Sequence, residues 1–357
     1  MARDTDRTLP REEIAGMVER VEPGWRLRGA TPSASGWTAV YRVTVDTGSG
    51  RRECVLKATP HADHPAGVGA EARIQAVVGA TTAIPVPAVF GVVDADDSLR
   101  TPFFLMEAMP GETVTMADVG SLPDAVLRGV ARETGRYLGE LHGLDTGLDA
   151  FGKCVGHDSP PLRGGPPSGD PAALVAEGGD GRWPAVVRGW VEEDLDALAD
   201  SRFADLAPAL RRELLARVDA LGDSFAPVLG RVDHGWSNLL VRDGHIEGVI
   251  DWGSRFAVPP GFDLAVVEHL LAGGWWLPLP EVPDRRPLVR EALLAGYREA
   301  ATVPPDLAAQ RACYHLDDTV RWIAHLEEKA GSDPRAVPEA RVEEAAAGFR
   351  AAVEAEL

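Results

Sequence analysis

Three side chains that carry oxygen atoms, Asp233, Asn238 and Asp251, follow one another at spacings of five and thirteen residues. Mg²⁺ takes one or two carboxylate or amide ligands together with phosphate oxygens and water, and Asn238 and Asp251 can supply the protein part of that set. Asp233, beside such a metal, can accept the proton of an attacking hydroxyl. Phosphoryl transfer needs mainly positioning and neutralisation of charge, so these residues are sufficient in kind for that chemistry.

The segment around these residues predicts a β-hairpin. Residues 239–242 and 245–250 are expected to be strands, and the Asp-Gly pair between them favours a type I′ turn. Because a hairpin brings its two ends together, we expect Asn238 and Asp251 to lie close to each other. Taken singly, each of the three residues is explained equally well as a turn or strand-end residue, so their joint spacing is what favours a site.

The elements upstream predict a small β-rich lobe, in which Lys57 lies on a strand. Hydrophobic periodicity distinguishes the helices from the strands. In chain order we expect a helix over 11–21, strands over 37–45 and 52–58, a helix over 71–78, and strands over 88–93 and 103–107.

Beyond Met109-Pro110-Gly111 the spacing of apolar residues becomes helical, apart from the hairpin. The stretch 151–183 is rich in Pro and Gly, which predicts a long loop or insertion. The sequence therefore predicts an α+β fold with an N-lobe over 1–108 and a large, mainly helical C-lobe over 109–357.

Composition restricts the partners. The chain has 36 Lys and Arg against 55 Asp and Glu, a formal charge of −19, which argues against nucleic acid and anionic membranes and is compatible with cationic substrates. Cys54, Cys154 and Cys313 are far apart, which is typical of reduced thiols. No segment is apolar enough for a signal peptide or a membrane span, so a cytoplasmic protein is expected.

In these motifs the chain resembles the aminoglycoside phosphotransferases and choline-kinase-like enzymes, which are relatives of protein kinases. That family carries HGDxxxxN, then a strand ending in IDW or IDF, then GDPxxDLA. The resemblance extends over roughly residues 25–270. The matching segments are Arg231-Val232-Asp233, Asn238, Ile250-Asp251-Trp252, Asp263-Leu264-Ala265, Lys57, Glu71, Ile84-Pro85-Val86-Pro87, the hinge-like Phe104–Gly111, and Leu141-His142-Gly143-Leu144-Asp145.

The resemblance implies a two-lobed protein-kinase-like fold and transfer of the γ-phosphoryl group of Mg-ATP to a small-molecule hydroxyl. Asp233 would be the catalytic aspartate, which orients the acceptor hydroxyl. Asn238 and Asp251 would bind Mg²⁺. The acidic charge and the habit of the family favour an acceptor that bears an amine, such as an aminoglycoside or an amino alcohol.

The resemblance also implies an ATP site built mainly on the N-lobe. Lys57 would hold the α- and β-phosphates, and Glu71 would pair with Lys57. Glu107 would offer a backbone carbonyl, and Met109 a backbone N–H, to the edge of the adenine. The chain uses Arg at nearly every basic position yet keeps Lys57, which fits a site where a compact ammonium meets phosphates.

Some positions depart from the family. Arg231 and Val232 stand where the family has His and Gly, and we expect Arg231 to support the loop in place of the His. An alternative alignment on His234-Gly235 would put Trp236 at the catalytic position, but its spacing to Asn238 and Asp251 is wrong.

Two further differences bear on the nucleotide site. The GDP is replaced by Val-Pro-Pro over 258–260, and the phosphate-loop region over 27–40 has no GxGxxG, although Ser33, Ser35 and Gly36 could offer donors to phosphates. Together with Arg231, these departures keep a second hypothesis open, a non-catalytic nucleotide-binding protein on the same fold. The oligomeric state is not predicted.

Overall fold

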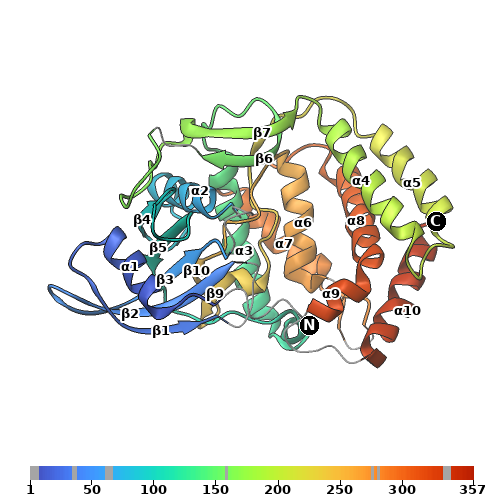
Figure 1. Cartoon of the computed structure of the whole chain (residues 1–357). Coiled ribbons are helices and arrows are strands. Elements are labelled where there is room, and N and C mark those ends of the chain that lie inside the picture. Colours follow the sequence, from blue (N-terminus) through green and yellow to red (C-terminus); the bar gives the residue numbers. More distant parts are fainter. Residues whose placement is uncertain are drawn as a thin grey trace.

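The computed structural model describes residues 8–33, 38–60, 67–156, 160–274, 277–279, 282–332 and 339–357. Over these residues the chain has two lobes, one built around a β-sheet and the other mainly helical (Figure 1). The predicted α+β, two-lobed class is confirmed.

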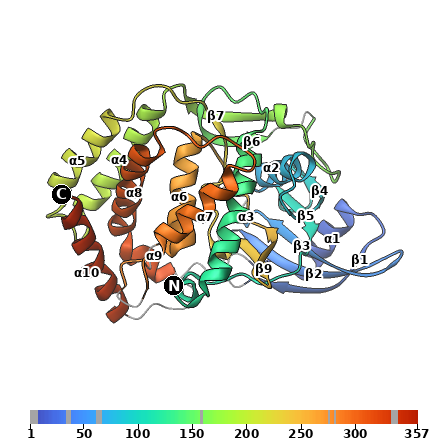
Figure 2. The same ribbon diagram turned by 180° about the vertical axis from the view of Figure 1, so that it is seen from behind.

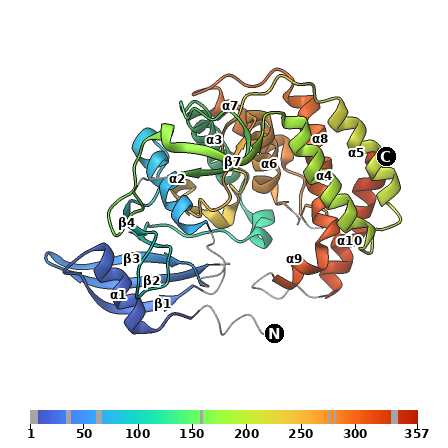
Figure 3. The same cartoon turned by 45° about the horizontal axis from the view of Figure 1, so that its top comes forward.

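The N-lobe contains an antiparallel sheet in the order β1-β2-β3-β5-β4. Helix α1 (Arg11–Val21) packs on it from outside, and helix α2 (Val68–Thr81) lies between this sheet and the C-lobe (Figure 1, Figure 3). Tyr41, Val43 and Val45 alternate inward, which explains their period-two pattern. The strands are β1 (Arg26–Pro32), β2 (Ala39–Thr47), β3 (Gly50–Ala58), β4 (Val89–Val93) and β5 (Phe103–Glu107).

Strand β1 is absent from the sequence prediction, which treats this region as part of a loop. None of its residues is buried, and it pairs only with β2, with a bulge between Leu27 and Gly29. An exposed edge strand lacks the apolar alternation that reveals an inner strand. Its strand conformation therefore comes from its pairing partner and not from its own pattern.

The prediction of a long loop over 151–183 is wrong. Strands β6 (Phe151–Gly156) and β7 (Leu174–Asp180) occupy much of it. They join β8 (Val228–Gly230) and β11 (Phe256–Val258) in a sheet of order β7-β6-β11-β8. These strands are short and their partners are distant in the sequence, so the Gly- and Pro-rich composition hid them.

The 239–250 hairpin is confirmed. Strand β9 (Leu239–Arg242) pairs with β10 (His245–Val249), and the turn residues Asp243 and Gly244 have φ values of 51° and 80°. Positive φ at both turn positions is what a type I′ turn requires. Glu112, just after the end of the N-lobe sheet, bridges to Val241, which ties the hairpin to the connection between the lobes.

The C-lobe core is organised around α3 (Asp124–His142), which lies parallel to α7 (Arg286–Tyr297) and packs against it: Arg285 contacts Asp124 at the start of the pair, and Tyr297 contacts His142 at its end (Figure 2). The two backbones touch. A Cβ atom at Gly135 would lie 1.9 Å from the Leu293 carbonyl oxygen, and one at Gly296 would lie 1.9 Å from that of Arg132. Only glycine permits this approach, and α3 of this pair also packs on β10 of the hairpin.

A second layer of helices packs beyond α6 (Pro260–Ala272) and forms its own apolar core (Figure 1, Figure 2). Within the described residues, no helix has the length and apolarity to cross a membrane. The helices of this layer are α4 (Trp183–Ala199), α5 (Ala207–Asp219), α8 (Leu307–Ala324), α9 (Leu326–Ser332) and α10 (Glu339–Glu356).

Candidate active site

A cleft of about 800 Å³ lies between the two lobes, and the catalytic, metal-binding, phosphate-binding and hinge residues named below, all predicted from the sequence, line it. The N-lobe sheet, α2, the hinge after β5, the 231–238 loop and the residues after β10 all contribute. The predicted residues brought together are Lys57, Glu71, Glu107, Met109, Asp233, Asn238 and Asp251.

Lys57 connects the two sides of this cleft. Its Nζ donates to Glu71 Oε1 at 2.9 Å and to Asp251 Oδ1 at 3.0 Å. Lys57 and Glu71 are buried, at 6% and 2% exposure. Burial alone would lower the pKa of Lys57, but the carboxylates of Glu71 and Asp251 outweigh it and raise the pKa. Lys57 is therefore held as a cation at the floor of the cleft.

Glu71 lies in the first turn of α2, as expected, and faces β3, which carries Lys57. Its burial raises the pKa of its carboxyl, against the opposing effect of Lys57. Burial would also raise the pKa of Asp251, but there Lys57 prevails and the pKa is lowered. Lys57 thus keeps Asp251 ionised, while Glu71 holds Lys57 in place.

The hairpin brings Asn238 and Asp251 together as predicted. The Ile250 N–H donates to the Asn238 carbonyl at 3.0 Å, and Asp251 follows in the left-handed region with φ of 58°. That conformation is strained for a non-glycine residue, and such residues cluster at ligand sites. It turns the chain sharply where the Asp251 side chain enters the cleft.

These donors fit Mg²⁺. Asn238 Nδ2 donates to the Asp233 carbonyl at 2.9 Å, which leaves the amide oxygen as a ligand. One amide and one half-exposed carboxylate match what Mg²⁺ takes from a protein when phosphates and water complete its shell. Among the described residues, no group of three or more His, Cys, Asp and Glu side chains could hold a metal.

Asp233 is held within the 231–238 loop by the residues behind it. The Arg231 N–H donates to Asp263 Oδ2 at 2.7 Å, and that oxygen also lies 3.0 Å from His142 Nε2. His142 Nδ1 in turn lies 3.0 Å from the Tyr297 hydroxyl. Asp263, His142 and Tyr297, which form this chain of hydrogen bonds behind the loop, are all buried. Asp263, the one strong match left in the altered GDP motif, therefore anchors the loop that carries Asp233.

Arg231 occupies the place of the family His and is 1% exposed. Its Nη2 donates to the Ile250 carbonyl at 2.6 Å, and its guanidinium lies 4.7 Å from the centre of the Trp252 ring. Burial lowers its pKa, while Asp233, Asp251 and other nearby carboxylates oppose that shift. Arg231 thus links the loop to the end of β10 and supplies positive charge behind the carboxylates.

The alternative alignment does not fit the structure. Trp236 is fully buried, and its indole N–H donates to the Leu271 carbonyl, away from the cleft. His234 is buried against Thr134. Asp233, in contrast, lines the cleft.

Other polar residues line the cleft without having been predicted. Ser254 Oγ donates to Asp233 Oδ2 at 3.5 Å, and the buried Arg255 adds positive charge near Glu71. Lys153, on β6, also lines it. The rarity of lysine in this chain is a signal for Lys153, whereas no motif marks Ser254 or Arg255.

The nucleotide end of the cleft is formed by the hinge. Glu107 and Met109 both line it, and within the described part of the chain the Met109 N–H has no hydrogen-bond acceptor. Ser33 lines the cleft as well, while Ser35 and Gly36 lie outside the described residues.

Comparison with known proteins identifies the family. The model of the phosphotransferase enzyme family matches residues 29–313. No curated protein matches significantly in sequence. Among solved structures, a thermostable mutant of aminoglycoside phosphotransferase APH(4)-Ia is 16% identical over 95% of this chain and 99% of its own, with a TM-score of 0.57.

Two other solved structures show the same fold. The GDP and kanamycin complex of APH(2")-IIIa is 13% identical over 96% of this chain and 97% of its own, with a TM-score of 0.59. Macrolide 2'-phosphotransferase MphH from Brachybacterium faecium is 18% identical over 95% of this chain and 98% of its own, with a TM-score of 0.55. The family model spans most of the chain, and the chain therefore belongs to the phosphotransferase enzyme family.

Proposed function

We propose that this small-molecule phosphotransferase moves the γ-phosphoryl group of Mg-ATP to a hydroxyl of its acceptor, with Asp233 as the catalytic residue. The observation that carries the proposal is the convergence of Lys57, Asp233 and Asp251 in one cleft, with Lys57 Nζ between Glu71 and Asp251. Cation, proton acceptor and metal ligand are the parts that phosphoryl transfer needs.

In this mechanism the acceptor oxygen forms a bond to the γ-phosphorus, and the bond to the bridging oxygen of ADP breaks with its electron pair. Asp233 orients the hydroxyl and takes its proton, which then passes to solvent. Mg²⁺ bound by Asn238 and Asp251 would neutralise charge on the phosphates. Lys57 would hold the α- and β-phosphates and is itself fixed by Glu71.

The nucleotide would lie against the hinge, with the Glu107 carbonyl and the Met109 N–H at the adenine edge. The Met109 N–H supports this, since it lines the cleft and has no hydrogen-bond acceptor among the described residues, so it is available to a ligand. Structures of APH(4)-Ia are described with ADP or AMP-PNP and hygromycin B, which supports a nucleotide in the corresponding cleft.

The acceptor is proposed to be a hydroxylated amine, similar to an aminoglycoside or an amino alcohol. The charge of −19 supports a cationic acceptor, because a strongly acidic protein attracts cations and repels anionic metabolites. The description of one relative with kanamycin agrees with this class.

The competing hypothesis is a nucleotide-binding protein without catalysis, which the Arg231 substitution and the altered GDP motif favour. Against it, Arg231 and Asp263 still hold the 231–238 loop. ADP release from Mg-ATP, with and without hydroxylated amines, separates the two. We expect turnover that Asp233→Ala lowers about a thousandfold and that Asp97→Ala, which removes an exposed carboxylate, leaves unchanged. Equal turnover in both variants, or none with any acceptor, would instead support the binding protein.

A further inference from the structure

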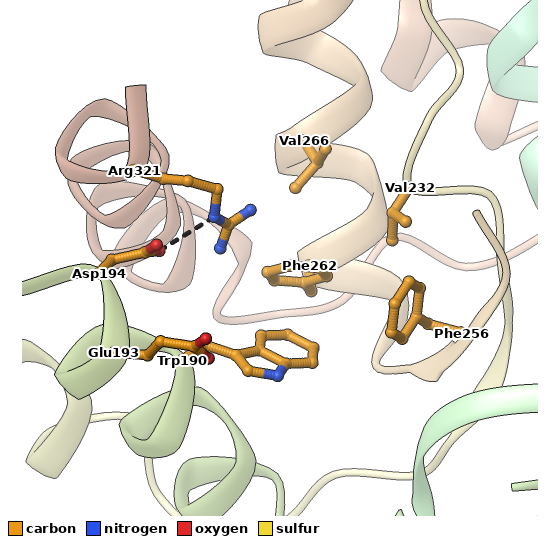
Figure 4. A pocket seen from close by; sticks show the side chains of 8 residues that line it. All are labelled: Trp190, Glu193, Asp194, Val232, Phe256, Phe262, Val266 and Arg321. Carbon is orange, nitrogen blue, oxygen red and sulfur yellow. Dashed lines mark hydrogen bonds and ion pairs between the residues drawn. The ribbon is translucent and has the colours of Figure 1, made fainter. Parts of the chain in front are cut away.

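A second cavity, of about 320 Å³, lies in the C-lobe between α4, α6 and α8 (Figure 4). We call it the aromatic pocket. Its volume is at the lower end of the range of small-molecule sites, about 300–1,000 Å³. The residues that line it are Trp190, Glu193, Asp194, Val232, Phe256, Phe262, Val266 and Arg321.

The aromatic pocket adjoins the interlobe cleft at two points. Val232 lines the pocket, and the next residue, Asp233, lines the cleft. Phe256 lines the pocket, and the preceding residue, Arg255, lines the cleft. The pocket and the cleft are therefore lined by adjacent residues of the same two segments, one of which carries Asp233.

Most of the pocket wall is apolar. The Trp190 ring centre lies 5.9 Å from that of Phe256 and 5.7 Å from that of Phe262. Trp190 and Phe256 are only half-buried, so apolar faces remain open to a ligand. A hydroxyl placed against such faces loses its hydrogen bonds to water without replacement, which is costly. The wall thus favours an apolar ring or chain over a polyhydroxylated sugar.

One end of the pocket is acidic. Arg321 Nε donates to Asp194 at 3.0 Å (Figure 4). Its Nη2 donates to Asp317 at 3.2 Å. Asp318 lies 3.9 Å from the same guanidinium. Of the charged residues that line the pocket itself, Glu193 and Asp194 are two carboxylates against the single cation of Arg321. Glu193 has no ion-pair partner among the described residues and is exposed. This end therefore has a surplus of negative charge.

Trp190 and Glu193 also lie three residues apart on α4, which places them on the same face of the helix. An ammonium group between them would meet both an aromatic face and a carboxylate, and each of these attracts a cation. A phosphate or carboxylate at the same position would be repelled.

From this arrangement we infer that the aromatic pocket binds the body of the acceptor, and that the acceptor is an amphipathic amino alcohol. Its apolar ring or chain would pack on Trp190, Phe256 and Phe262, and its single amine would face Glu193. This inference rests on the proposed function for the transfer step, and it narrows the acceptor class away from polycationic sugars.

Four probes test the inference by calorimetry and by ADP release with the full-length protein. N-benzylethanolamine carries the ring, the amine and the hydroxyl. N-methylethanolamine lacks the ring, 2-benzyloxyethanol lacks the amine, and kanamycin is a polar polycation. We expect N-benzylethanolamine to bind roughly tenfold or more tightly than the compound without the ring. We also expect a preference of roughly fivefold over the compound without the amine.

Single-residue variants test which side chains produce the preferences for the ring and for the amine. Trp190→Ala is expected to abolish the preference for the ring, Trp190→Phe to retain most of it, and Glu193→Gln to remove the preference for the amine. Glu192→Gln, which changes an exposed neighbour on α4 outside the pocket lining, is the matched control and should leave both preferences unchanged.

Binding and turnover are read separately, so the two proposals can fail independently. Tightest binding by kanamycin, or ring and amine preferences that survive Trp190→Ala and Glu193→Gln, would overturn the inference even if Asp233-dependent turnover is present. Absence of that turnover would overturn the proposed function, and calorimetry with the same variants would still decide whether the pocket binds amphipathic amines.

Discussion

The interlobe cleft and the aromatic pocket meet at the 231–238 loop, but different interactions build them. In the cleft, the buried Lys57 pairs with the buried Glu71 and with the half-exposed Asp251, so each charge depends on another. In the pocket, the Trp190 ring of α4 packs edge to face on Phe256 of β11 and at a tilt on Phe262 of α6, and the charges lie at one end. A reaction common to a family needs charged groups in fixed positions, as in the cleft. Substitution of the rings in the aromatic pocket would change the shape of the pocket and therefore the ligand that it fits.

This difference predicts that removing one charged partner in the cleft lowers stability strongly, whereas substituting a ring of the aromatic pocket lowers it only slightly. A buried ion left without its partner costs several kcal/mol, because its desolvation is no longer offset. A half-exposed aromatic ring loses only part of its burial energy. The predictions below test this contrast, beginning with the largest expected effect.

The largest effect is expected for Lys57→Met. The change leaves Glu71 buried without its cation, so we expect a loss of about 3–5 kcal/mol in the free energy of unfolding, measured by denaturant titration. Turnover should fall at least a hundredfold, since the proposed phosphate contact is lost. The double variant Lys57→Met, Glu71→Gln should recover part of the stability but none of the turnover. A single variant as stable as the wild type would contradict the buried-network interpretation.

The next effect concerns Arg231. Replacement by Met removes the positive charge behind Asp233 and Asp251 and the hydrogen bond to the Ile250 carbonyl. We expect a loss of about 3 kcal/mol in stability, together with a fall in kcat larger than the change in KM for ATP. Arg231→Lys keeps the charge and should recover part of both. If Met and Lys behave alike, the charge of Arg231 has no role in the site.

A smaller effect is expected for Trp190→Ala. Because the ring is half-exposed, we expect a loss of only about 1–2 kcal/mol in the free energy of unfolding. KM for ATP should stay unchanged while the KM of the acceptor rises. A loss as large as that of Lys57→Met would show that the two sites do not differ in tolerance.

The smallest effect is a dependence of stability on pH at the acidic end of the pocket. Burial raises the pKa of Asp317 to about 7, against the effect of Arg321, with Asp194 on α4 and Asp318 on α8 adding to the rise. Between about pH 4 and 7 the folded state then holds a proton that the unfolded state has lost, so stability falls as pH rises through this window.

We expect the melting temperature to fall by about 2–4 °C across that window and then to level off. Asp317→Asn has no proton to lose and should flatten the dependence. Scanning calorimetry at several pH values measures it, and the exposed Glu192→Gln variant serves as the control. An unchanged slope in Asp317→Asn would place the titrating group elsewhere.

Much of the N-lobe and the hairpin is predictable from the sequence, because their signals are local. Helix α1 and strand β5 begin and end where the periodicity places them, and Asp243-Gly244 forms the expected turn. The exposed edge strand β1 and the strands β6 and β7 are not predictable in this way, since partners distant in the sequence give them their conformation.

In the candidate cleft, too, the residues that local motifs mark are predictable and those placed by tertiary contacts are not. Lys57, Asp233 and Asp251 lie in short motifs whose spacing is set by single strands and turns, so a linear pattern marks them. Ser254 and Arg255 follow the Ile250-Asp251-Trp252 motif but reach the cleft only because the chain turns sharply at Asp251. No spacing encodes that turn.

The sequence by itself determined the family, the lobed architecture and the motif residues of the cleft, such as Lys57, Asp233 and Asp251, because each depends on contacts within one or two elements. Only the tertiary structure decided how Arg231 and Asp263 hold the 231–238 loop, since their partners are distant in sequence or belong to the backbone. The tertiary structure alone also showed the aromatic pocket, because the residues that line it come from α4, α6, α8 and β11. A cavity is the space that packed helices leave, and that space has no pattern in any one of them.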